Sequence, residues 1–169
     1  MNTFTSDSPT QASGRFSRRA YLAWNLLLGI IFTLIAVVVG LLIPGAPNAL
    51  TEGAMSTPLM IIFFIMYAIV IYYSVIFLIR RLHDRDHSGW LALLILVPVV
   101  NILFAFYVLF APGNNDSNSF GQPRPTKGWE TVLAVLYIVV FIVGILAAIM
   151  IPSYQNYVIR SQQTTIQQQ

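Results

Sequence analysis

The stretch YLAWNLLLGIIFTLIAVVVGLLI, residues 21–43, decides the fold class of this 169-residue chain. It carries no charge and exceeds the roughly 20 residues that a helix needs to cross a bilayer. Three further long uncharged stretches follow, at residues 53–79, 88–115 and 131–159. Because the bilayer core holds no water, each segment must satisfy its own backbone polar groups, which favours helices over a barrel here. The sequence therefore predicts an all-α integral membrane bundle of four transmembrane helices.

The composition supports the same class of protein. Apolar residues make up 57% of the chain and charged residues only 9%, too few to cover a water-soluble fold. There is no cysteine, which excludes disulfides and thiolate ligands. Nearly all the arginines flank apolar segments, where contact with an anionic lipid headgroup contributes about 1 kcal/mol each. We therefore expect membrane lipid with anionic headgroups as a partner, and no nucleic acid.

The chain divides into a tail, a membrane domain, a further helix and a second tail. Residues 1–13 are predicted to form a polar, disordered N-terminal tail. They lack the apolar core of a cleaved signal, so we expect the first span to direct insertion. The predicted parts that follow are a membrane domain at 14–125 with apolar segments at about 21–43, 58–79 and 90–111, a fourth membrane helix at 126–160, and a polar tail at 161–169.

Basic residues predict the orientation. Arg15, Arg18 and Arg19 precede the first span. By the positive-inside rule, the N-terminus is expected to be cytoplasmic in a multi-pass protein of the bacterial inner membrane.

The third apolar segment allows two arrangements, because Pro98 and Asn101 interrupt its middle. If the segment crosses as a kinked helix, Arg124 and Lys127 lie outside with the other basic flanks inside. If it breaks near Pro98 and re-enters, only Arg160 lies outside. Both arrangements obey the charge rule. The full crossing is the favoured prediction, because kinked spans are commoner than re-entrant loops.

The densest polar feature is the run Arg80-Arg81-Leu82-His83-Asp84-Arg85-Asp86-His87. One interpretation is a cytoplasmic cap, in which arginines contact lipid phosphate and aspartates pair with them. A second is a planar fork of Arg80 and Arg81 that binds a phosphate or a carboxylate from another segment. A metal site of His83, His87 and one aspartate is the least favoured, and no metal is assigned.

Two groups of residues are therefore candidates for binding. Gly144 and Ala148 form a small-xxx-small pair suited to helix packing with a second copy or another membrane protein. The sequence contains no catalytic constellation and no cofactor motif, so we predict a protein that is not an enzyme. The candidate headgroup or interaction site comprises Arg15, Arg18, Arg19, Arg80, Arg81, His83, Asp84 and Trp90.

Three motifs in order resemble a known family over about residues 14–125. They are Gly14-Arg15-x-Ser17-Arg18-Arg19-x-Tyr21, then Arg80-Arg81-Leu82-His83-Asp84 with Ser88-Gly89-Trp90, then Pro112-Gly113 with Asn118-x-Phe120-Gly121-x-Pro123. Together they resemble the domain-of-unknown-function 805 (DUF805) family of small bacterial inner-membrane proteins. The resemblance implies a location in the inner membrane and assigns no activity.

A second resemblance lies in the last apolar segment. Residues 144–157, followed by Arg160-Ser161-Gln162, look like the N-terminal helix of type IV pilins. Val135 stands where pilins carry a glutamate. The pilin helix runs from the cytoplasm outward, which would require the re-entrant form of the third segment.

The leading prediction is a non-enzymatic inner-membrane scaffold or accessory protein that packs with itself or with other membrane proteins. One alternative is a type IV pilus biogenesis accessory or pilin-like protein. Another is a lipid- or solute-handling protein that binds headgroups through Arg80, Arg81, His83 and Asp84.

Overall fold

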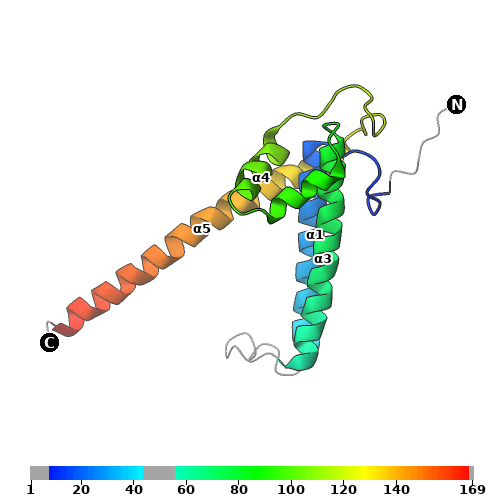
Figure 1. Ribbon diagram of the computed structural model, residues 1–169. Helices are drawn as coiled ribbons and strands as arrows, with labels where there is room; N and C mark the ends of the chain where they lie inside the picture. The colour runs from blue at the N-terminus through cyan, green and yellow to red at the C-terminus, as the bar shows by residue number, and fades with distance from the viewer. Residues whose placement is uncertain (1–7, 44–55, 168–169) are drawn as a thin grey trace. The chain divides into compact units, whose positions relative to one another are not determined.

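A computed structural model describes residues 8–43 and 56–167 of the chain (Figure 1). Within these residues no β-strand occurs, and a single isolated bridge pairs Asn118 with Gly121. The predicted all-α class is confirmed. The connection predicted between the first two spans lies largely outside the described residues. The helices are α1 (Arg18–Leu42), α3 (Thr57–His83), the 3-10 helix η1 (Gly89–Leu96), α4 (Val100–Phe110) and α5 (Gly128–Gln167).

In the described residues, three helices are long and apolar enough to cross a membrane. They are Arg18–Leu42, Thr57–His83 and Gly128–Arg160, with mean hydropathies of 2.7, 2.6 and 3.2. Ser17 caps the first, because its Oγ accepts a hydrogen bond from the Ala20 N–H at 3.2 Å. Three of the predicted membrane helices therefore form.

Helices α1 and α3 lie side by side as an antiparallel pair (Figure 1). Near the start of α1, the Phe16 N–H donates to the Arg80 carbonyl at 2.9 Å. At the other end, Leu59 packs against Val39 and Ile43. The pair thus brings two basic clusters together. The first cluster is Arg15, Arg18 and Arg19, and the second is Arg80, Arg81 and Arg85.

The third apolar segment is broken into two short helices. Pro98 lacks an N–H and disfavours helix at the residue before it, so η1 ends and Val97 is extended. Val99 then adopts a φ of +68° before α4 begins. With eight and eleven residues, each helix is about 16 Å long, roughly half of the hydrocarbon core. The fourth predicted span is therefore not confirmed.

Both ends of this segment return to the C-terminal end of α3. A Cβ added at Gly89 would come within 2.9 Å of the Ile79 side chain, and one at Gly113 would overlap the Asp84 carboxylate. Between these ends, Ala92 of η1 and Phe104 of α4 join a buried cluster with Leu82. Residues 89–110 thus form a helical hairpin, called the hairpin below, that packs on the end of α3.

The chain forms two compact units, Met1–Ala134 and Val135–Gln169. The first turns of α5 belong to the first unit, and its remaining length makes up the second. Within the second unit, α5 continues through Pro152 to Gln167. Gly144 and Ala148 are exposed there, and no atom lies within 4 Å of a Cβ added at Gly144. Helix packing through this pair stays a prediction.

Candidate functional site

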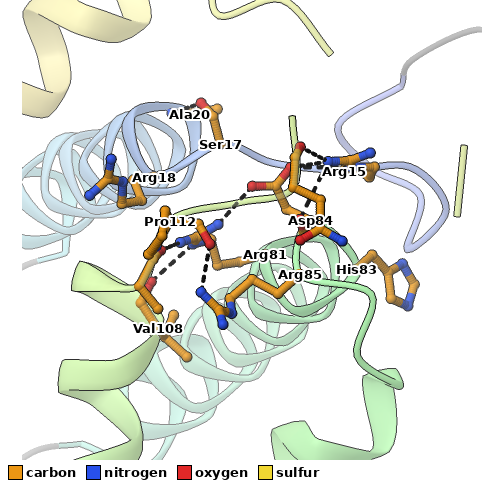
Figure 2. A network of polar contacts seen from close by, with 12 residues as sticks. Arg15, Ser17, Arg18, Ala20, Arg81, His83, Asp84, Arg85, Val108 and Pro112 are labelled. Carbon is orange, nitrogen blue, oxygen red and sulfur yellow. Dashed lines mark hydrogen bonds and ion pairs between the residues drawn. The ribbon is translucent and has the colours of Figure 1, made fainter. Parts of the chain in front are cut away.

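The site is built around Asp84, the residue that ends α3. Its carboxylate lies between two guanidinium groups, as Figure 2 shows. Arg15 Nε donates to Oδ1 at 3.2 Å, and Arg81 Nη1 donates to Oδ2 at 2.8 Å. The arginine side chains are 0% and 1% exposed and the aspartate 8%. Arg15, Arg81 and Asp84 together are called the polar centre below.

Arg15 connects the polar centre to the loop that follows α4. Its Nη1 donates to the carbonyls of Asp116 at 2.8 Å and Gly121 at 3.0 Å. Its Nη2 donates to the Asn114 carbonyl at 2.5 Å. All these donors belong to one rigid planar guanidinium group. Arg15 therefore fixes the path of the loop.

Arg81 connects the polar centre to the end of α4. Its Nε donates to the Val108 carbonyl at 2.9 Å, and its Nη2 donates to the Ala111 carbonyl. The last carbonyls of a helix lack partners within the helix and carry partial negative charge.

Two further arginines bind the same helix end. Arg18 donates to the Phe110 carbonyl at 3.1 Å, and Arg85 donates to the Pro112 carbonyl at 2.6 Å. Arginines from both basic clusters therefore hold the end of the hairpin.

Arg80 points away from Arg81. Its guanidinium lies 4.0 Å from the centroid of the Phe16 ring and donates to the Ser8 carbonyl at 2.5 Å. Neighbouring residues on a helix face different directions, so the two arginines do not form the predicted fork. Arg81 instead pairs with Asp84 of its own run, and the second guanidinium on that carboxylate comes from another segment, as Arg15.

The two histidines have separate partners. The His83 ring stacks on Phe120 with centroids 3.8 Å apart and planes at 6°. The His87 Nε2 lies 2.5 Å from the Tyr107 hydroxyl, which also accepts from Arg85 Nε at 2.7 Å. In the part of the chain that the structure describes, no three His, Cys, Asp or Glu residues are grouped to hold a metal. The histidines instead hold the loop and α4.

Glu130 forms a second buried ion pair that the sequence reasoning missed. Its side chain is 0% exposed, and its two oxygens accept from Arg124 at 2.6 and 3.1 Å. The Lys127 N–H donates to it at 2.8 Å and Trp24 Nε1 at 3.0 Å. The available signal was a lone acidic residue in the first turn of an apolar helix, which needs a cationic partner nearby.

The predicted headgroup site divides by exposure. Arg15, Arg80, Arg81, His83 and Asp84 are buried, with the contacts given above. The remaining members are exposed: Arg18, Arg19 and Trp90, the last at 81%. Binding of lipid headgroups stays a prediction, and only these exposed side chains are open to it.

The comparison with protein families decides the identity. The model of a family described as "Protein of unknown function (DUF805)" matches residues 9–122. The chain belongs to the DUF805 family. The expectation from the three sequence motifs is confirmed, while the pilin-like resemblance is not shown. The DUF805 match contains the polar centre and the hairpin, whereas Glu130 and most of α5 lie beyond it.

The DUF805 relatives give the location. Inner membrane protein YhaH of Escherichia coli strain K12 is 36% identical over 114 residues, which cover 66% of this chain and 84% of YhaH. Inner membrane protein YhaI of the same strain is 30% identical over 114 residues, covering 65% of this chain and 82% of YhaI. No solved structure matches the chain. This DUF805 chain is thus a bacterial inner-membrane protein of unknown activity.

Proposed function

We propose that this DUF805 protein is a non-enzymatic inner-membrane scaffold or accessory protein. The observation that carries the proposal is the use of its densest polar residues. Arg15 and Arg81 direct their donors at Asp84 and at backbone carbonyls, so these charges hold the chain together. The long apolar helix faces, by contrast, remain exposed and are available for lipid and for other membrane proteins.

The proposed topology has three crossings and a cytoplasmic N-terminus. The start of α1 meets the end of α3 at the polar centre, and the start of α5 adjoins the start of α1, since Ser17 Oγ lies 2.7 Å from Thr126 Oγ1 and Trp24 donates to Glu130. Every lysine and arginine except Arg160 lies at that end of the spans. The positive-inside rule then favours the cytoplasm for this end. With the hairpin returning to its starting side, the C-terminus is external.

Cross-linking in membranes tests the scaffold proposal. The protein, cross-linked before extraction and purified, is expected to carry a partner in fixed ratio, either a second copy or another inner-membrane protein. Gly144→Leu enlarges the exposed small-residue face of α5 and is expected to lower that ratio. Gly29→Leu, at an equally open glycine of α1, is the matched control. A protein recovered without any partner in fixed ratio would contradict the proposal.

A role in pilus biogenesis is the second candidate. Its support is that α5 would run from the cytoplasm outward in the three-crossing topology, as a pilin helix does. The helix also continues past Pro152 without interruption. Deleting residues 144–162 is expected to abolish piliation on this hypothesis, while a chain ending at Gln162 serves as control. Unchanged piliation after the deletion eliminates it.

A further inference from the structure

The hairpin exposes apolar side chains along both of its helices and at its tip. No charged residue occurs between Ser88 and Asn115. Continuous apolar surface of this kind is not stable in water and indicates contact with lipid or protein. The most exposed of these side chains are Trp90 at 81%, Leu96 at 74%, Val99 at 72%, Leu103 at 70% and Phe110 at 68%.

Among the residues that the structure describes, the rest of the first unit covers only the inner face of the hairpin. Its buried cluster uses Leu78 and Leu82 from the last turns of α3, with Tyr21 of α1 beside them. The hairpin therefore packs at the end of the α1–α3 pair that carries the polar centre. Each of its helices is long enough to reach about half of the hydrocarbon core.

The backbone of the tip is suited to an environment without water. Pro98 has no N–H to satisfy. The Val97 N–H donates to the Leu94 carbonyl of η1 at 3.2 Å, and the Val100 and Asn101 N–H groups donate to the Pro98 and Val97 carbonyls at 2.8 and 2.9 Å. Lipid tolerates irregular backbone only where polar groups find such partners.

Acyl chains fit this surface better than a protein partner does. The exposed side chains lie on both helices and on the tip, so a partner would have to surround the hairpin, which lipid does. Trp90 stands at the start of the hairpin, and an exposed indole at that position suits the headgroup boundary. The nearest charged residues before and after the uncharged segment lie at the same end of the hairpin. A structure that is inserted into the membrane from one face requires this arrangement.

We propose that the hairpin is embedded in a single leaflet of the membrane, with acyl chains as its partner. The leaflet is the one next to the polar centre, and the tip at Leu96–Val99 lies in its hydrocarbon. The inference deepens the proposed function and rests on its three-crossing topology. The polar centre is the anchor that keeps both ends of the hairpin at the membrane surface.

Single cysteines test the proposal without background, because the chain has none of its own. Ser88→Cys, Leu96→Cys and Asn115→Cys are spin-labelled in vesicles of phosphatidylethanolamine and phosphatidylglycerol, with Ile69→Cys in the middle of α3 as the depth reference. The label at position 96 is expected to lose collisions with a water-soluble nickel complex and keep those with oxygen, as the reference does. Labels at 88 and 115 are expected to meet nickel, and an impermeant maleimide should reach both from the same side.

Each other outcome overturns a different part of the account. If the maleimide reaches positions 88 and 115 from opposite sides, the segment crosses, and both the leaflet proposal and the three-crossing topology fail. If both ends face one side but the label at 96 meets nickel, the hairpin lies in water. If that label is shielded from both nickel and oxygen, protein covers the tip. In these last two cases the leaflet proposal fails and the topology stands.

Discussion

Asp84 carries the single negative charge between two buried arginines. Removing it leaves Arg15 and Arg81 buried without a counter-charge, a change that typically costs about 3–5 kcal/mol. Asp84→Asn is therefore expected to lower the free energy of unfolding of the purified protein by that amount. Asp86→Asn is the control, because Asp86 is exposed and its carboxylate accepts from the Ser119 N–H. Equal effects of the two substitutions would argue against a buried polar centre.

Gly113 is required by its distance to the same carboxylate. A Cβ there would overlap Asp84 and force the ion pairs apart. We expect Gly113→Ala to destabilise the protein by about 1–3 kcal/mol, as overpacking usually does. Gly144→Ala, in open space, should stay within about 0.5 kcal/mol. Thermal unfolding in detergent compares the two, and a tolerated Gly113→Ala would contradict the geometry.

The sequence singled out the residues of the polar centre but did not predict how they pair. Arg15, Arg81 and Asp84 were singled out as basic flanks and a polar run. The Arg81–Asp84 pair is local, but the contact of Arg15 with Asp84 joins residues 69 positions apart, and local spacing carries no record of such a contact. Glu130 was missed although Arg124 is only six positions away; its other partner, Trp24, is 106 positions away and leaves no local signal.

At the scale of elements, the turn between η1 and α4 holds Val99 at a positive φ, with φ +68° and ψ −49°. A β-branched residue at a φ of +68° is strained, typically by about 1–3 kcal/mol. Val99→Gly removes that strain at some cost in chain entropy and is expected to stabilise the protein by about 1 kcal/mol. Val100→Gly, inside α4, should instead lower the unfolding free energy by up to about 1 kcal/mol. A loss of stability in both variants would show that the turn differs from the structure.

The presence of Pro98 predicted a break in the third segment, but it did not predict the direction of the chain after the break. A proline-kinked crossing helix and a re-entrant hairpin contain the same residues at the break. Which arrangement forms depends on the C-terminal end of α4, whose carbonyls accept hydrogen bonds from Arg81 and Arg18. Those bonds form between segments distant in the sequence, so the favoured full crossing rested only on the relative frequency of the two arrangements.

For the whole molecule, composition and the lengths of the apolar segments were sufficient to predict a helical membrane protein. They were not sufficient to count its crossings. Both arrangements of the third segment leave basic residues mostly on one side, so the charge rule cannot choose between them. The polar centre supports the re-entrant arrangement. Arg15 donates both to the Asp116 carbonyl, which follows the hairpin, and to Asp84, which precedes it.

The side of the membrane on which the C-terminus lies tests the central claim most directly. Two reporters are fused in turn after Gln169, a phosphatase that is active only outside the inner membrane and a fluorescent protein that matures only inside. Three crossings from a cytoplasmic N-terminus predict an active phosphatase and a dark fluorescent protein. A fluorescent fusion with an inactive phosphatase would mean an even number of crossings and would contradict the re-entrant hairpin.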